Sequence, residues 1–342
     1  MLKNMLKIDL SYQKVKYAKI FTGIVILLLL FLIPVFIHKP YYLHIFILAI
    51  IYIIVVCSLR TVALSGQVSI GHAAFMAIGA YASGILAKQF GLTPWLTIFL
   101  GAVVSMLFAL AIGFPFTRVR AFYFSMVSLF GGIAIMNLIR VAEKWTGATS
   151  LAGIPPLDSL NIPGIVQITF SNQKAAYYYF ILIVALLCLA FLYSLEHSRI
   201  GMTWKAISQS HQVASSVGIN ESRYRVLALA VGCFFSGLAG ACYAHYNLVL
   251  TPSTFGFLPS IYLVMYMLVG GLGSFWGPVL GTAIFVLVPE IFRWMKEYTP
   301  LLVGGIMVIV VFLLPKGMVS LFYRNEPKIR KIHKKEALRY DA

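Results

Sequence analysis

Residues 196–224 read EHSRIGMTWKAISQSHQVASSVGINESRY. This polar stretch lies between apolar runs at residues 177–195 and 225–249, and each run has the roughly 20 residues that a helix needs to cross a bilayer. A short polar segment between two spans predicts an extramembrane element that is tied to both of them. We expect Thr203 to Val217 to form a helix, which Gly218 ends by supplying left-handed backbone.

Composition sets the broad class. Hydrophobic residues make up 61% of the 342 residues, charged residues make up 11%, and the mean hydropathy is +0.90. Such a chain lacks the polar residues needed to cover a soluble globule. The apolar residues run on without alternation, which indicates helices and excludes barrel strands. The sequence therefore predicts an all-α polytopic membrane protein of about ten transmembrane helices, at residues 18–37, 41–59, 73–87, 94–116, 121–139, 177–195, 225–249, 258–272, 277–292 and 299–314.

The distribution of charge explains the formal net charge of +17. Most of the 27 lysines and arginines fall on one side if the N-terminus is cytoplasmic, as the positive-inside rule requires. We expect a cytoplasmic segment at 1–19, a transmembrane domain at 20–314 whose first span is not cleaved, and a basic cytoplasmic tail at 315–342. The tail is expected to lie against anionic lipid headgroups, so the basic charge does not indicate nucleic acid. The loop 196–224 is then cytoplasmic, and the loop 141–176 is external.

The sequence shows no catalytic or metal-binding pattern. The four cysteines, Cys57, Cys188, Cys233 and Cys242, lie in apolar runs without paired spacing, which is typical of small buried hydrophobic residues. No phosphate-binding G-x-x-x-x-G-K-[ST] motif occurs. We therefore expect that the chain is not an enzyme and binds neither a metal nor a cofactor.

Two glycine-rich stretches, at residues 65–75 and 270–278, interrupt the apolar pattern. Irregular backbone at membrane depth is tolerated where protein or a water-filled cavity surrounds it, and broken helices in transporters flank the pathway. The candidate pathway residues are Gly66, Gln67, Ser69, Gly71, His72, Gly273, Ser274 and Gly277. A structural role is the alternative, because small residues four apart also allow close helix packing, and buried Gln and His often form structural hydrogen bonds. Close packing is the favoured interpretation for the small residues of 232–244.

The motifs of the chain, in their order, resemble the permeases of branched-chain amino acid ABC importers, and above all the larger of the two permease types in such systems. The resemblance extends from about residue 60 to Glu290. The residues that carry it are Ser65–Phe75, Gly79–Tyr81, Thr146-Gly147, Gly153–Pro156, Ser198–Gly201, Ala206-Ile207, Ala214, Gly218–Asn220, Arg223-Tyr224, Ser236–Gly240, Tyr243–Tyr246, Pro252, Phe255 and Gly270–Gly281.

This resemblance implies the ABC importer permease fold in a bacterial plasma (inner) membrane. It implies a second homologous permease, two cytoplasmic ATPase subunits that use ATP and Mg, and an extracytoplasmic substrate-binding protein. Residues Ala206 to Gly218 would form the coupling helix that docks in an ATPase groove and drives alternating access. The implied coupling residues are Trp204, Ala206, Ile207, His211, Ala214 and Gly218.

The coupling loop departs from the family pattern in its charges. Basic and acidic residues are usual where this chain has Ser208, Gln209, Ser210 and His211, and an acidic residue is common near Ser215. The electrostatic part of docking is therefore expected to differ, with a matching change in the ATPase or with weaker coupling.

Substrate identity stays open at the level of sequence. Phe75, Met76, Phe124 and Met126 are candidates for an apolar pocket wall and equally for bundle packing. Urea, short amides and other amino acids remain alternatives to branched-chain amino acids. An ion-coupled secondary transporter is disfavoured, because no Asp or Glu lies well inside a predicted span. An intramembrane enzyme is disfavoured by the absence of a nucleophile and base at matched spacing.

Overall fold

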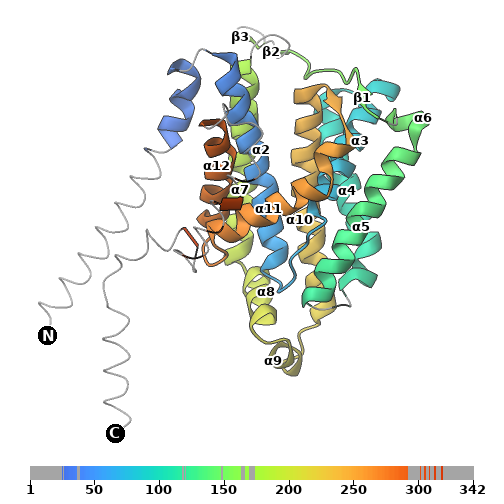
Figure 1. The fold of residues 1–342 in the computed structure, drawn as a ribbon, viewed down its shortest axis with the longest axis vertical. Helices are drawn as coiled ribbons and strands as arrows, with labels where there is room; N and C mark the ends of the chain where they lie inside the picture. The colour runs from blue at the N-terminus through green and yellow to red at the C-terminus, as the bar shows by residue number, and fades with distance from the viewer. Residues whose placement is uncertain are drawn as a thin grey trace, which may run out of the picture.

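The computed structural model describes residues 25, 27–36, 39–117, 119, 121–147, 149–162, 166–168 and 174–291, and a few positions between 301 and 318. Its helices form a bundle (Figure 1). A first apolar helix is described over Leu27–Phe36. The others are α2 (Pro40–Ala63), α3 (His72–Phe90), α4 (Pro94–Thr117), α5 (Ala121–Val141), α6 (Glu143–Thr146), α7 (Lys174–His197), α8 (Arg199–Gln209), α9 (His211–Ser216), α10 (Glu221–Asn247), α11 (Phe257–Gly270) and α12 (Trp276–Ile291), with a 3-10 turn, η1, at Pro252–Phe255.

The described strands are short and lie at one end of the bundle. β1 (Leu151–Ala152) pairs antiparallel with β4 (Val249–Leu250), and β2 (Leu160–Ile162) pairs antiparallel with β3 (Val166–Ile168). The α8 and α9 helices project from the opposite end (Figure 1). The predicted all-α class is therefore confirmed, and the β-structure of the described residues consists of two small pairings outside the bundle.

Six helical segments of the described chain are long and apolar enough to cross a membrane: α2, 94–116 of α4, 122–141 of α5, α7, α10 and Pro252–Gly270. The apolar helices Leu27–Phe36 and Trp276–Leu287 are shorter. The predicted span 73–87 falls within α3, a helix of 19 residues. The segment 1–19, most of the span 299–314 and nearly all of the tail 315–342 lie outside the described residues.

α10 is the central helix of the bundle, since it packs against α2, α3 and α4. Small residues allow the close approach of these helices. A Cβ atom at Gly237 would overlap Ser105 of α4, and one at Gly240 would overlap the carbonyl oxygen of Met76 in α3. The close packing predicted for residues 232–244 is therefore confirmed.

Buried polar side chains fix the C-terminal half of α10. The imidazole Nε2 of His245 lies 2.9 Å from Ser83 Oγ and 3.0 Å from Thr97 Oγ1, and Nδ1 lies 2.8 Å from the carbonyl oxygen of Pro155. Both ring nitrogens thus have partners, as a buried polar group requires. His245 is therefore a structural residue that ties α10 to α3, to α4 and to the 142–173 connection.

We expect Gly240→Ala to destabilise the protein by about 2 kcal/mol, because the new methyl group meets backbone that cannot move aside. Gly113→Ala is the matched control in α4, where the added Cβ would lie 3.5 Å from Val226, an ordinary contact. Thermal unfolding of the purified protein in detergent measures the difference. Equal unfolding temperatures for the two variants would contradict the packing argument.

Candidate functional site

The polar segment 198–218 forms two short helices where the sequence predicts one. The Ser198 hydroxyl accepts the Gly201 N–H at 3.5 Å and caps α8, and the Ser210 hydroxyl accepts the Val213 N–H at 3.4 Å and caps α9. Ser210 has extended backbone, with φ −157° and ψ 108°. A serine that caps a helix cannot also continue one, so the predicted helix 203–217 is divided at this residue.

Gly218 follows α9 with φ +81°, the left-handed conformation predicted from the sequence. Its N–H donates to the Ser215 carbonyl at 3.0 Å, and the N–H of Ile219 donates to the Ala214 carbonyl at 3.1 Å. These bonds close the helix end. A side chain at this position would strain the backbone.

The inner face of α8 and α9 is packed against the protein itself. The Trp204 side chain is fully buried, and its Nε1 donates to the Tyr224 carbonyl at 2.8 Å. Ile207 and Ala214 are buried as well. Three of the six predicted coupling residues therefore hold the segment in place, and their side chains are covered by this chain.

The outer face of the two helices carries apolar residues that the sequence analysis did not single out. Met202 is 59% exposed, Val213 is 64% exposed and Val217 is 70% exposed. Ala206 and Gly218 are exposed beside them, and His211 is half-buried. We call Met202, Ala206, Val213 and Val217 the outer α8–α9 face. The sequence signal that could have identified this face is the presence of apolar residues within a polar segment.

A buried ion pair connects this segment to the bundle. The Glu196 carboxylate, near the end of α7, accepts hydrogen bonds from the Arg60 guanidinium of α2, including one at 3.0 Å from Nη2. Lys205 of α8 places its Nζ 2.9 Å from Glu196 Oε1. The Arg60 and Glu196 side chains are 4% and 7% exposed, whereas Lys205 is 42% exposed. Two cations thus share one buried carboxylate.

The same arginine holds the second glycine-rich segment. Arg60 Nε and Nη2 donate to the Leu272 carbonyl at 3.3 and 3.2 Å, and the guanidinium lies 5.8 Å from the centre of the Phe275 ring. Residues 271–275 link α11 to α12. A cation over an aromatic ring is attracted to its face. Arg60 is therefore the common contact of α7 and the 271–275 link.

The first glycine-rich segment touches α8 directly. Gly66 has φ +83°, and a Cβ atom there would lie 3.2 Å from Ser208 Cα. Side chains of α5 fix the rest of the segment, because Ser125 Oγ donates to the Val68 carbonyl at 2.7 Å and the Ile70 N–H donates to Ser128 Oγ at 3.0 Å. Both glycine-rich segments therefore border the projecting helices or their ion pair.

The candidate pathway residues have different surroundings. Gln67, Ser69 and His72 are fully buried within the chain, and His72 Nε2 lies 3.0 Å from Ser58 Oγ. A Cβ atom at Gly277 would overlap the Gly271 carbonyl, whereas one at Gly273 would meet no atom. Ser274 is half-buried, and its Oγ accepts the Trp276 N–H at 3.3 Å. Only Gly71 of this set borders the cavity described next.

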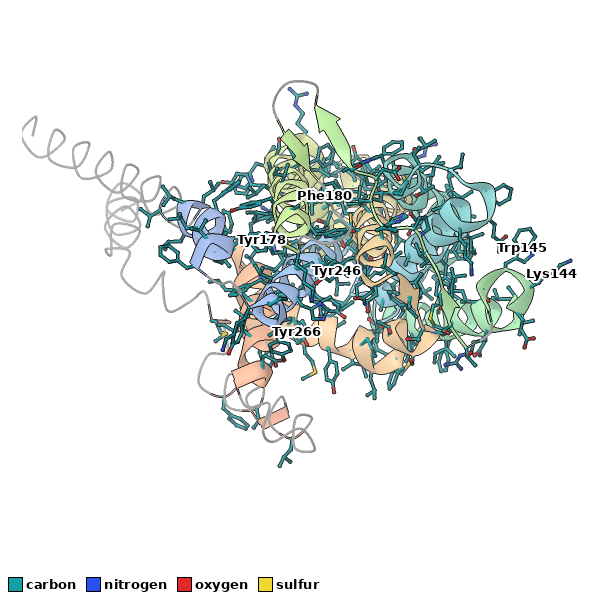
Figure 2. The ribbon with its side chains drawn as sticks, turned by 90° about the horizontal axis from the view of Figure 1, so that it is seen from above. Lys144, Trp145, Tyr178, Phe180, Tyr246 and Tyr266 are labelled. Atoms are coloured by element: carbon teal, nitrogen blue, oxygen red, sulfur yellow. The ribbon has the colours of Figure 1, made fainter. Side chains whose placement is uncertain are left out.

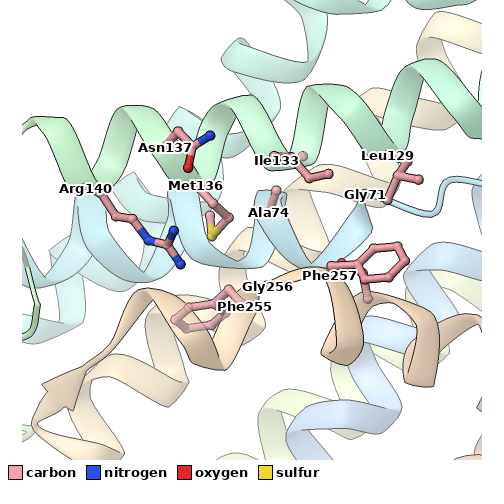
Figure 3. A pocket seen from close by; sticks show the side chains of 12 residues that line it. Gly71, Ala74, Leu129, Ile133, Met136, Asn137, Arg140, Phe255, Gly256 and Phe257 are labelled. Atoms are coloured by element: carbon pink, nitrogen blue, oxygen red, sulfur yellow. The ribbon is translucent and has the colours of Figure 1, made fainter.

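A cavity of about 430 Å³ lies between α3, α5 and the turn from η1 into α11 (Figure 3). Its wall is mostly apolar and includes no carboxylate. The lining residues are Gly71, Ala74, Leu129, Gly132, Ile133, Met136, Asn137, Arg140, Phe255, Gly256, Phe257 and Ser260. None of Phe75, Met76, Phe124 and Met126, the apolar wall candidates of the sequence analysis, is among them.

We expect Glu196→Gln to destabilise the protein by about 3 kcal/mol, because it leaves the buried Arg60 charge without its anion. Glu143→Gln, at an exposed position on α6, is the matched control and should have no effect beyond about 0.5 kcal/mol. Thermal unfolding in detergent measures both variants. Limited proteolysis at Lys205 should accelerate only in Glu196→Gln, and an unchanged digestion rate would contradict the proposed anchoring of α8.

Comparison with known proteins identifies proteins that this chain resembles in sequence. The chain is 29% identical over 289 residues to a high-affinity branched-chain amino acid transport system permease protein, LivM, of Salmonella typhimurium, covering 79% of this chain and 68% of the relative. It is 23% identical over 282 residues to LivH of Escherichia coli K12, with 78% and 88% covered. A guanosine ABC transporter permease protein of Bacillus subtilis is 27% identical over 264 residues, with 68% and 81% covered. No solved structure matches.

The family described as "Branched-chain amino acid transport system / permease component" matches residues 41–311. That range includes both glycine-rich segments, the Arg60–Glu196 pair, the α8–α9 segment and the cavity. The match covers well over half of the chain, and it agrees with the apolar helices of the bundle. The protein accordingly belongs to the family of branched-chain amino acid transport system permease components.

Proposed function

We propose that this chain is the membrane-spanning permease subunit of an ATP-driven importer of branched-chain amino acids. The observation that carries the proposal is the family match over residues 41–311, which includes the projecting α8–α9 segment and its buried anchor. The chain itself performs no hydrolysis, and ATP and Mg bind to the partner ATPases. Two permease subunits and two ATPase subunits form the complex, and an extracytoplasmic binding protein delivers the substrate.

The outer α8–α9 face is the contact for the ATPase. Met202, Val213 and Val217 are largely exposed in this chain, although large apolar side chains on a polar segment favour burial. The face projects beyond the end of the bundle, where a cytoplasmic subunit can reach it (Figure 1). An ATPase groove that covers these side chains removes them from water, and this burial stabilises the complex.

Motion of α8 would be transmitted by two routes. In the first route, Lys205 of α8 is paired with Glu196, and Glu196 is bonded to Arg60. Arg60 in turn donates to the Leu272 carbonyl of the 271–275 link. In the second route, Ser208 of α8 packs against Gly66 of the first glycine-rich segment. A shift of α8 by ATPase closure therefore displaces both segments together, which is the movement that alternating access between two faces requires.

The arrangement in the membrane follows from this docking. We place α8 and α9 in the cytoplasm of a bacterium, with both termini, and we place the 141–176 loop outside, where the binding protein docks. The ten spans predicted from the sequence, 18–37 and 299–314 among them, would fulfil this topology. Gly66, Gln67, Ser69, Gly71, His72, Gly273, Ser274 and Gly277 form or support the pathway beside the broken helices.

Substrate class is the part of the proposal that rests on relatives. The LivM and LivH proteins are named for branched-chain amino acids, and the Bacillus subtilis relative is named for guanosine. The mostly apolar cavity wall supports a small substrate with an aliphatic side chain. Guanosine is the second candidate, because the similarity to its permease covers most of both chains.

The direct test is uptake by proteoliposomes that contain this chain with its cognate ATPases, second permease and binding protein. We expect ATP-dependent import of labelled leucine, isoleucine and valine, and no import of urea or guanosine. ATP hydrolysis should rise when the loaded binding protein is added. Guanosine import without leucine import would retain the ATP-driven machine and overturn the amino acid assignment.

We expect Val213→Glu to reduce leucine import at least about 10-fold, since a charge at the centre of a packed interface has no partner there. Folding should be unaffected, because Val213 is 64% exposed. Gln212→Glu adds the same charge at the neighbouring exposed position of α9 and serves as the control. Copurification of the ATPases with each variant separates docking from transport. Full import by Val213→Glu would exclude this face as the docking surface.

A further inference from the structure

We propose that the cavity between α3, α5 and the η1–α11 turn binds the substrate amino acid, with Arg140 holding its carboxylate and the apolar wall holding its aliphatic side chain. This inference rests on the proposed function and deepens it, because nothing in the comparisons assigns substrate-binding residues. Three features of the cavity support the assignment: the charge of Arg140, the polar groups beside it and the shape of the space.

Arg140 is a cation that has no anion among the residues the structure describes. It lies in the last turn of α5, and within the described part of the chain it makes no hydrogen bond or ion pair. An arginine near a helix end often extends to lipid headgroups, whereas Arg140 lines the cavity, where it lies beside Phe255 (Figure 3). Its guanidinium presents five N–H donors, in a fork that matches a carboxylate. An unpaired arginine on a cavity wall therefore selects for an anionic group.

Two further polar side chains border the same cavity without protein partners. The Ser260 residue is only 4% exposed, and its hydroxyl makes no hydrogen bond within the described chain. Asn137, one helical turn from Arg140, likewise makes no side-chain hydrogen bond among the described residues. Ser260 is buried, so its missing partner is costly, and a ligand can satisfy it, whereas Asn137 is exposed. The Asn137 and Ser260 oxygens are acceptors suited to an α-ammonium group.

The backbone adds to the positive character of this region. α11 begins at Phe257 on the cavity wall, and its N-cap residue Gly256 provides no side-chain cap. The first N–H groups of a helix carry partial positive charge. Half-helices of transporters use this end to face anionic substrate groups. The start of α11 therefore adds to the positive charge of Arg140, and both favour a carboxylate over an ammonium group.

The rest of the wall is apolar, and Phe255 in it is packed tightly against its neighbours. Leu129, Ile133 and Met136 of α5 face Phe255 and Phe257 of the η1–α11 turn (Figure 3). Phe255 is 1% exposed and contacts the edges of Tyr81 and Tyr243, at ring-centroid distances of 6.4 and 5.7 Å. A volume of about 430 Å³ lies within the roughly 300–1,000 Å³ typical of small-molecule sites.

These properties define the ligand class. A zwitterion with an aliphatic side chain satisfies Arg140, the polar pair and the apolar wall together. A cationic side chain would lie without a carboxylate partner, because the lining includes no Asp or Glu. Urea and guanosine have no carboxylate for the arginine. The site therefore favours neutral aliphatic amino acids.

The location of the cavity relates it to the α8 movement of the proposed transport cycle. Its wall extends along α5 from Leu129 to Arg140, about 16 Å at the rise of an α-helix. Gly71, at the other end, belongs to the first glycine-rich segment, and Gly66 of that segment touches α8. A shift of the segment would alter the cavity wall where Gly71 faces Ser128. A shift of α8, transmitted through Gly66 to Gly71, can thus release a bound substrate.

The first test compares leucine import by Arg140→Gln, Arg140→Lys and the native chain in the reconstituted complex. We expect Arg140→Gln to raise the KM for leucine about 10- to 100-fold, as expected for the loss of a charge-assisted pair, and Arg140→Lys to recover part of this loss. Lys144→Gln removes an equal charge from exposed α6, which lies at the periphery (Figure 2), and should match the native chain.

A second test needs no transport. All four native cysteines are buried, so Ser260→Cys introduces a single labelling site on the cavity. We expect a small thiol reagent to modify Cys at 260 in the assembled complex, and excess leucine to slow the modification. Leucine amide, which lacks the carboxylate, should give much weaker protection.

The outcomes separate this inference from the proposed function. A native complex that imports no leucine overturns the function itself. Native import with an unchanged KM in Arg140→Gln overturns the substrate site alone. Loss of the second permease from Arg140→Gln, together with no protection at position 260, would assign the cavity to the contact between permeases and overturn the site as well.

Discussion

The buried carboxylate of Glu196 is the constraint on which the end of the bundle next to α8 and α9 depends. It is bound by Arg60 from inside the bundle and by Lys205 from the projecting α8 helix. A carboxylate removed from water requires such partners, and removal of the carboxylate would leave the buried Arg60 charge uncompensated. The pair therefore sets the distance between the bundle and α8. It also fixes the 271–275 link, because Arg60 binds the Leu272 carbonyl.

Close packing provides the rigid frame around this pair. Gly79, Gly237 and Gly240 let the backbones of α3, α4 and α10 approach so closely that a methyl group would overlap neighbouring atoms. Such a core transmits displacement as a unit, because interiors packed to this density compress little. Against this frame, the two glycine-rich segments are the irregular connections that adjoin α8 and Arg60. The contacts for which we propose a role in transport thus lie where the regular bundle ends.

Charge at the other end of the bundle has a different arrangement. Arg140 borders a mostly apolar cavity and has no anion among the described residues. Arg60 is compensated within the chain, and for Arg140 we propose a ligand carboxylate. Arg60 is 4% exposed and serves the fold, whereas Arg140 is exposed and available for recognition. The sequence treats both alike, as single cations at the ends of apolar runs, and only their neighbours distinguish them.

The sequence by itself determined the class of the protein, the positions of its main apolar helices, the left-handed Gly218 and the family, because hydropathy, glycine conformation and motif order are local properties. It did not determine the division of the coupling segment at Ser210, where a capping bond competes with helix continuation. Nor did it determine that Trp204, Ile207 and Ala214 face inward. The Arg60–Glu196–Lys205 cluster joins residues as many as 145 positions apart, and the cavity combines α3, α5 and α11. These features were decided by the tertiary structure, because distant side chains interact only after helix packing has brought them together.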